Sequence, residues 1–189
     1  MEQMKLSDIV CKFNLSAPLI DSAHFENTRA SAVLLPLLEV DNKAALLFCK
    51  RAAYLKHHPS QICFPGGKFE QFDPSLQATA IRETNEELGI CPSHINSIGQ
   101  LPTHNTLTGF TISPIVATLQ SHASWHTDSD EVERVFTISL ERLFDEKNWR
   151  SIEVQLGGKA RKFDIFPTEH GLLWGATAKL VKNLAQLVN

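Results

Sequence analysis

The feature that most constrains this chain is the segment over residues 66–90, in which two adjacent glycines precede an acidic helix. Glu83, Glu86 and Glu87 stand at spacings of three and four residues, which place them on one face of that helix. Three carboxylates on one face repel each other by roughly a few tenths of a kcal/mol per pair, and a hard divalent cation removes the repulsion. Magnesium favours carboxylate oxygens and keeps waters that a phosphate can replace. The segment therefore predicts a metal site that handles phosphate.

Local signals set the bounds of this helix. Asp73 is a residue type that caps helix N-termini, and Pro74 fits the first helical position. Gly89 follows the last apolar residue and is suited to end the helix. Arg82 lies four residues before Glu86, so we expect its guanidinium group to brace that carboxylate.

An acidic helix alone also fits a solvated charged face. The glycine pair distinguishes the two interpretations, because the Gly66-Gly67 backbone lets a carbonyl or amide group approach a metal ion or phosphate closely. A solvated face does not need such a pair, and we therefore favour the metal site.

The remaining pattern predicts a mixture of strands and helices in one domain. A buried strand is expected over residues 29–38, ending near Pro36, and a second over residues 44–49, with Asp41-Asn42 as the turn between them. Further strands are expected over residues 97–101, 111–119 and 133–139, a hairpin over residues 153–156 and 162–166, and helices over residues 5–13, 141–147 and 175–188. The fold class that follows is α/β or α+β with a mixed sheet.

The composition and net charge of the chain limit the classes of molecule that it is expected to bind. The 189 residues carry a net charge of −3 with scattered basic residues, which argues against nucleic acid and against an anionic membrane surface. Four cysteines form no metal-binding spacing and are expected to be buried, reduced thiols. The chain has no run of about 20 apolar residues and its start has no leader-like run, so we expect a cytoplasmic protein. The expected partner is a small molecule, and the sequence leaves a homodimer open.

At residue 67 a longer motif begins. It reads G-x5-D-x8-R-E-T-N-E-E-L-G-I and resembles the Nudix box, G-x5-E-x7-R-E-U-x-E-E-x-G-U, in which U is aliphatic. Asp73 stands in place of a glutamate with one extra residue after it, and Thr84 stands in place of an aliphatic residue. The extra residue precedes the glutamate face, so the spacing of the three glutamates is intact.

The resemblance implies a fold, a reaction and a set of site residues. The implied fold is the Nudix α/β/α sandwich with a mixed β-sheet, and the implied reaction is hydrolysis of a nucleoside diphosphate linked to another group. Mg²⁺ or Mn²⁺ would be the cofactor. The residues expected to hold the metal are Glu83, Glu86, Glu87 and the Gly66 carbonyl. Glu131 is our candidate for the loop glutamate that serves as general base or as a further ligand; an exposed acidic turn is the alternative for it.

A second motif precedes the glycines. Residues 47–67 are similar to the signature of the coenzyme A pyrophosphatase branch of the family, L-L-T-x-R-[SA]-x3-R-x3-G-x3-F-P-G-G. Cys49, Lys56 and Ser60 depart from it, and Lys56 keeps the charge but loses the bidentate fork of arginine. The resemblance makes Arg51, Lys56 and Gly67 the expected substrate-binding residues. Surface charges at the end of a strand are the alternative for the two cations.

Two other functions stay open. One is a Nudix enzyme for another nucleoside diphosphate derivative, such as a sugar or a dinucleotide. The other is a non-catalytic module that senses a nucleotide; such modules commonly lose box glutamates, and this chain keeps all three. We expect residues 1–28 to be an N-terminal segment without a motif and residues 29–189 to be the Nudix hydrolase domain.

Overall fold

The computed structural model of the chain describes residues 4–16, 28–106, 108–127 and 130–188. The helices are α1 (Leu6–Leu15), α2 (Leu76–Leu88), α3 (Leu140–Phe144) and α4 (Gly175–Val188), with 3₁₀ turns η1 (Pro92–His94) and η2 (Glu146–Asn148). The strands are β1 (Arg29–Val40), β2 (Lys43–Arg51), β3 (Ile62–Cys63), β4 (Gly66–Lys68), β5 (Ile95–Gln100), β6 (His104–Asn105), β7 (Phe110–Leu119), β8 (Val132–Ser139), β9 (Arg150–Leu156), β10 (Lys159–Thr168) and β11 (Gly171–Leu173). The expected helices and longer strands are all present, and the short strands β3, β4, β6 and β11 are additional.

The main sheet is mixed. Its strand order is β3-β2-β1-β7-β5, with β4 on β1, β6 on β7 and β8 on β2. The β1–β7 pair is parallel, and the other pairs are antiparallel. Strands β1 and β2 are apolar along nearly their whole length, as strands buried on both faces are.

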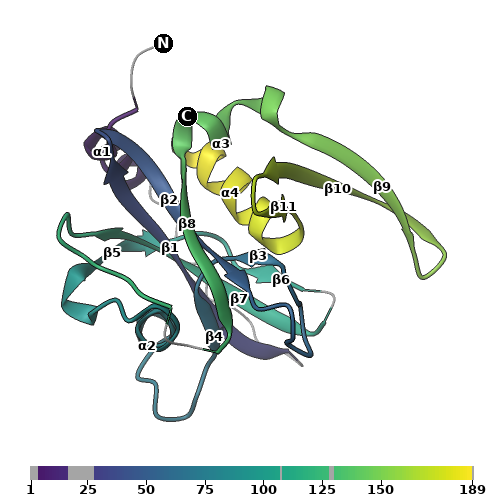
Figure 1. Cartoon of the computed structure of the whole chain (residues 1–189), viewed down its shortest axis with the longest axis horizontal. Coiled ribbons are helices and arrows are strands. Elements are labelled where there is room, and N and C mark those ends of the chain that lie inside the picture. The colour runs from purple at the N-terminus through teal and green to yellow at the C-terminus, as the bar shows by residue number, and fades with distance from the viewer. Residues whose placement is uncertain (1–3, 17–27, 107, 128–129, 189) are drawn as a thin grey trace.

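Helices cover both faces of this sheet (Figure 1). Successive side chains of a strand point to opposite faces, so Leu34 and Leu38 of β1 pack with Leu88 of α2, whereas Leu35 and Leu37 pack in the cluster that contains α1, α3 and α4. The two apolar clusters make an α/β/α sandwich around a mixed sheet in one domain. The fold expected from the sequence is confirmed.

The first hairpin forms as expected, but its first strand is longer. β1 and β2 pair antiparallel through Asp41 and Asn42, whose φ angles are 50° and 61°. Aspartate and asparagine tolerate this left-handed conformation. The expected end near Pro36 is wrong, because β1 continues to Val40. On one edge of β1 Pro36 is opposite Ala117 of β7; on the other edge it lies between the residues that pair with β4 and those that pair with β2, so its missing N–H group interrupts neither of these two ladders.

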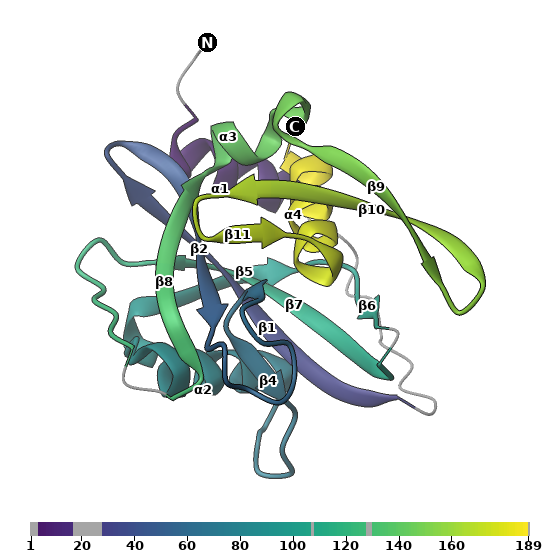
Figure 2. The same cartoon turned by 45° about the vertical axis from the view of Figure 1, so that its right-hand side comes forward.

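A three-stranded sheet, ordered β11-β10-β9, forms a separate layer. The expected hairpin is confirmed: β9 and β10 pair antiparallel and meet at Gly157 and Gly158, with φ angles of 57° and 75°. Figure 2 shows the tip of this hairpin projecting away from the main sheet. α4 packs against β10 and supports its base.

The N-terminal helix contributes to the core. Helix α1 buries Ile9 and Phe13 in the same apolar cluster as α4, and the N–H group of Ala44 donates a 2.9 Å hydrogen bond to the carbonyl oxygen of Met4. Residues 1–3 and 17–27 of the expected N-terminal segment lie outside the described residues. The described part of the segment is therefore packed on the sheet.

The cysteines follow the expectation in part. All four are free, and Cys49 is buried with Cys63 opposite it on β3. Burial raises the pKa of the Cys63 thiol to about 12. Cys11 and Cys91 are exposed, so the expectation of burial is wrong for these two. None of the helices in the described ranges is long and apolar enough to cross a membrane.

Candidate functional site

Helix α2 begins two residues later than its sequence signals indicate. Ser75 is the N-cap, and its hydroxyl oxygen accepts a 3.1 Å hydrogen bond from the N–H group of Ala78. The expected cap at Asp73, with Pro74 as first helical residue, is therefore wrong. At the other end Gly89 adopts φ 64° and donates to the carbonyl oxygen of Asn85, so the expected C-terminal cap is confirmed.

Asp73 forms an ion pair with Arg82 instead of capping the helix. Its two carboxylate oxygens accept from Nε and Nη2 of Arg82 at 2.9 and 3.0 Å, and it also accepts from the Thr79 hydroxyl and the Glu70 N–H group. The Arg82 hydrogen bond, with the Thr79 and Glu70 bonds, holds the pKa of this buried carboxyl well below its usual range. The pair fixes the loop between β4 and α2 against the helix.

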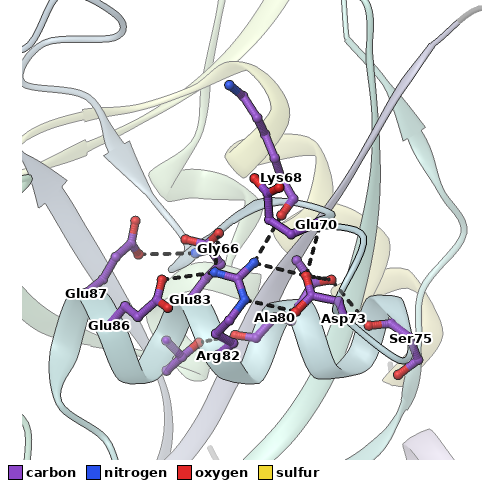
Figure 3. Close-up of polar contacts among 12 residues, drawn as sticks. Gly66, Lys68, Glu70, Asp73, Ser75, Ala80, Arg82, Glu83, Glu86 and Glu87 are labelled. Carbon is purple, nitrogen blue, oxygen red and sulfur yellow. Dashed lines mark hydrogen bonds and ion pairs between the residues drawn. The ribbon is translucent and has the colours of Figure 1, made fainter.

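Arg82 also reaches two of the three glutamates (Figure 3). Its Nη1 atom lies 2.9 Å from Glu86 Oε2 and 3.0 Å from Glu83 Oε1, which confirms the expected brace on Glu86. Its Nη2 atom donates to the carbonyl oxygen of Lys68 at 3.2 Å. One guanidinium group thus ties the acidic face to the glycine strand β4.

Glu83 lies against the backbone of Gly67. A Cβ atom at residue 67 would collide with the Glu83 carboxylate, so only glycine leaves room for it. Burial raises the pKa of Glu83, while its contact with Arg82 opposes the rise. The missing side chain of Gly67 therefore leaves the space that the Glu83 carboxylate occupies.

Glu87 is the most buried of the three glutamates, with 8% of its surface exposed. Its Oε2 atom accepts a 3.2 Å hydrogen bond from the N–H group of Gly66. Burial raises the pKa of Glu87 to about 8, and the charges of Glu83 and Glu131 add to the rise. This carboxylate lacks enough positive charge around it to be stable when ionised.

Glu131, in the segment before β8, acts on the same carboxylates. Its Oε2 atom lies 3.1 Å from Nη2 of Arg51 at the end of β2, and its charge acts on both Glu83 and Glu87. Arg51 in turn lowers the pKa of Glu87, and its Nε atom is buried without a hydrogen-bond partner among the described residues. The structure thus brings together Arg51, Glu131 and the inner side of the acidic face.

Lys56 is not brought to this cluster. It is exposed on the loop over residues 52–61, between β2 and β3. On the same loop Ser60 adopts φ 57°, a conformation that favours glycine. Ser60 therefore keeps the backbone shape that the signature glycine would have.

The acidic set has the chemistry for a hard divalent cation. Carboxylate oxygens are the ligands that Mg²⁺ and Mn²⁺ prefer, and a cation would supply the charge that Glu87 lacks. Within the described ranges, no three His, Cys, Asp or Glu side chains stand in the arrangement of ligands to one ion. Glu83 and Glu86 are both engaged with Arg82 instead. The Glu86 side chain is 57% exposed and has room to turn away from Arg82, and the donor set fits the chemistry of such an ion once these carboxylates turn toward it.

Two contacts were not foreseen from the sequence. Asp73 and Arg82 are nine residues apart across the helix start, which is no helical spacing. Tyr54 donates from its hydroxyl to the carbonyl oxygen of Asp130, 76 residues away. The Asp73–Arg82 contact could have been suspected, because Asp73 stands at an acidic position of the box. Tyr54 is a single exposed aromatic residue, and its contact leaves no periodic signal in the sequence.

Comparisons with known proteins agree with this geometry. A family model described as NUDIX domain matches residues 28–156. An uncharacterized Nudix hydrolase, NudL, of Photorhabdus laumondii is 34% identical over 185 residues, covering 98% of this chain and 98% of the relative. The protein of the same description from an Enterobacter species is 33% identical and covers 96% and 94%. The NUDIX domain of Shewanella oneidensis NrtR, solved in complex with ADP ribose, is similar with a TM-score of 0.57 at 15% identity, over 95% of this chain and 98% of that one; this likeness concerns the fold alone.

Proposed function

The chain belongs to the Nudix hydrolase family, and from that premise we propose that it hydrolyses the diphosphate of coenzyme A or of a coenzyme A derivative. The family and its named relatives make it a hydrolase of nucleoside diphosphate derivatives. The finer choice of coenzyme A rests on residues 47–67.

One observation supports this choice: the segment over residues 47–67 includes Arg51, which acts on Glu87 and pairs with Glu131, and the glycines that contact Glu87 and Glu83. The segment runs through β2, the following loop, β3 and the start of β4, so its first strand ends at Arg51 and its last residues reach Gly66. Phe64 is buried and its ring lies 4.8 Å from that of Phe48, which anchors the residues just before the glycine pair. A signature for substrate choice is thus continuous with the residues that contact Glu87.

The proposed cofactor is Mg²⁺ or Mn²⁺. Glu83, Glu86, Glu87 and the carbonyl oxygen of Gly66 would hold it, after Glu86 leaves Arg82. When bound, such a cation neutralises phosphate charge and lowers the pKa of a water molecule.

The protein side chains supply the remaining chemistry. Among the described residues the buried Nε atom of Arg51 has no hydrogen-bond partner, and it would donate to a phosphate oxygen in a strong, charge-assisted hydrogen bond. Lys56 lies on the adjoining exposed loop and would bind a further phosphate as a point charge. Glu131 would accept the proton of the attacking water, since its charge reaches the acidic face. Cleavage within the diphosphate of coenzyme A gives 4′-phosphopantetheine and 3′,5′-ADP.

A substrate panel tests the proposal. Purified protein is incubated with Mg²⁺ or Mn²⁺ and coenzyme A, ADP-ribose, a diadenosine polyphosphate or a nucleoside diphosphate sugar, and kcat/KM is compared. We expect the highest value for coenzyme A or an acylated form. A preference for another diphosphate of about tenfold or more would refute the substrate choice and leave the hydrolase assignment standing.

Matched variants test the site. Glu86→Gln should remove most of the activity without unfolding the chain, whereas Glu169→Gln, at an exposed glutamate on the β10–β11 turn, should leave it intact. Binding of a nucleotide without turnover by the wild-type protein would instead indicate the sensing module that the sequence left open.

A further inference from the structure

We propose that Tyr54 is a positioning residue that holds Glu131 over the acidic face of α2, an inference that rests on the function proposed above. Tyr54 is the one tyrosine of the 189 residues. Its hydroxyl donates a hydrogen bond to the carbonyl oxygen of Asp130, the residue directly before Glu131. The contact joins two loops that are far apart in sequence.

The segment that carries Glu131 needs such an anchor. The ladder between β2 and β8 shifts its register between Lys50 and Arg51 and ends at the pair Arg51–Val132. Glu131 lies beyond that end, and 55% of its side chain is exposed. The sheet therefore does not fix the direction in which its side chain leaves the backbone.

Beyond the end of the ladder, two other hydrogen bonds hold the successive carbonyl groups of Asp130 and Glu131. The N–H group of Ala52 donates to the carbonyl oxygen of Glu131 at 2.8 Å, and the Tyr54 hydroxyl binds the carbonyl oxygen of Asp130. A single bond would leave the chain free to turn about it, whereas these two bonds hold the two successive peptide units that flank the Cα atom of Glu131. The orientation of these two units sets the direction in which the Glu131 side chain leaves the backbone, and its carboxylate then meets Arg51 at 3.1 Å.

The hydroxyl is the part of Tyr54 that makes this contact. The residue is 72% exposed and absent from both apolar clusters, so its ring adds little to the core. The hydroxyl is already engaged with the protein backbone and is not directed to a ligand. Its loop also carries Lys56, so the same bond couples the proposed substrate-binding loop to the segment of Glu131.

A double-mutant cycle tests the inference, with Tyr54→Phe, Glu131→Gln and the double variant assayed on coenzyme A. Tyr54→Phe keeps the ring and removes the hydroxyl. We expect kcat to fall roughly three- to tenfold, which corresponds to one hydrogen bond, with KM within about twofold of wild type. In the Glu131→Gln background the same change should have no further effect, because the residue to be positioned no longer acts.

A matched control removes a similar bond elsewhere. The Thr168 hydroxyl donates to the carbonyl oxygen of Gly171 at 2.8 Å on the β10–β11 turn, so Thr168→Val should leave kcat unchanged. The thermal midpoint of Tyr54→Phe should stay close to that of the wild type because the ring is exposed.

The outcomes separate the two proposals. An unchanged kcat in Tyr54→Phe, or an equal loss with and without Glu131, overturns the positioning role. A raised KM with unchanged kcat also overturns it, since the ring would then contact substrate. If the wild-type protein cleaves another diphosphate instead of coenzyme A, the proposed substrate fails, and the cycle measured on that diphosphate still decides the role of Tyr54.

Discussion

Glu87→Gln should raise the stability of the metal-free protein at alkaline pH, although it removes a residue of the site. The wild-type carboxyl is 8% exposed, and burial raises its pKa from 4.5 to about 8 in the folded chain. A group whose folded pKa is raised contributes stability that is complete below its unfolded pKa and is lost as the pH rises through the folded value. Glu87 therefore costs stability increasingly between about pH 4.5 and pH 8.

The magnitude follows from the size of the shift. One pKa unit is worth about 1.4 kcal/mol. The cost of keeping Glu87 protonated in the folded chain, while it ionises in the unfolded chain, therefore grows by about 3.5 kcal/mol between pH 5 and pH 8. Glutamine has the same shape, stays neutral and can still accept from the N–H group of Gly66. The free energy of unfolding of the variant should thus gain about 3.5 kcal/mol on that of the wild type between the two pH values.

The assay is urea unfolding with a chelator present, at pH 5 and at pH 8. Glu86→Gln is the control, because its carboxylate is 57% exposed and paired with Arg82, and it should show no such gain. Adding Mg²⁺ or Mn²⁺ at pH 8 should stabilise the wild-type protein and not Glu87→Gln. A stability difference between Glu87→Gln and wild type that is the same at both pH values would refute the reasoning.

Three further substitutions test the surrounding contacts. Asp73→Asn should cost roughly 2 kcal/mol in urea unfolding at pH 7, because it removes the buried charge that binds Arg82 and leaves this half-buried guanidinium group only its contacts with Glu83, Glu86 and Lys68. The folded pKa of Asp73 is lowered, so its contribution is present above the ordinary carboxyl pKa and lost in acid; a deficit that did not shrink at low pH would contradict the pairing. Gly67→Ala should lower kcat/KM by about tenfold or more with little change in thermal midpoint, since the methyl group displaces a carboxylate, and full activity would exclude that contact. Ser60→Gly should stabilise the chain by roughly 0.5–1 kcal/mol by relieving a left-handed φ of 57°, whereas Ser121→Gly, which lacks such a φ, should not.

The sequence predicted the elements whose signals are local. The Asp41-Asn42 turn and the C-terminal cap at Gly89 follow from residue types that tolerate a left-handed backbone, and both are present. The three glutamates share a helix face because their spacing alone requires it. The mixed sandwich followed from the resemblance of the box to a known family.

The errors at Pro36 and Asp73 have a common physical cause, which is a tertiary contact that overrides a local preference. Pro36 stays inside β1 because the partners of the strand change at that point. Ser75 caps the helix instead of Asp73, because Asp73 forms a part-buried ion pair with Arg82. The contact between Tyr54 and Asp130 depends on how two loops meet in space, and no spacing along the chain reports it.

The central claim is that the acidic face of α2, with a divalent cation, hydrolyses the diphosphate of coenzyme A. Mass spectrometry of the products formed in ¹⁸O-labelled water with Mg²⁺ or Mn²⁺ tests it most directly. The account predicts 4′-phosphopantetheine and 3′,5′-ADP with one ¹⁸O atom in one of the two products, no reaction in chelator, and a near-complete loss in Glu86→Gln. Release of inorganic phosphate in their place, or equal product formation by Glu86→Gln and wild type, would contradict it.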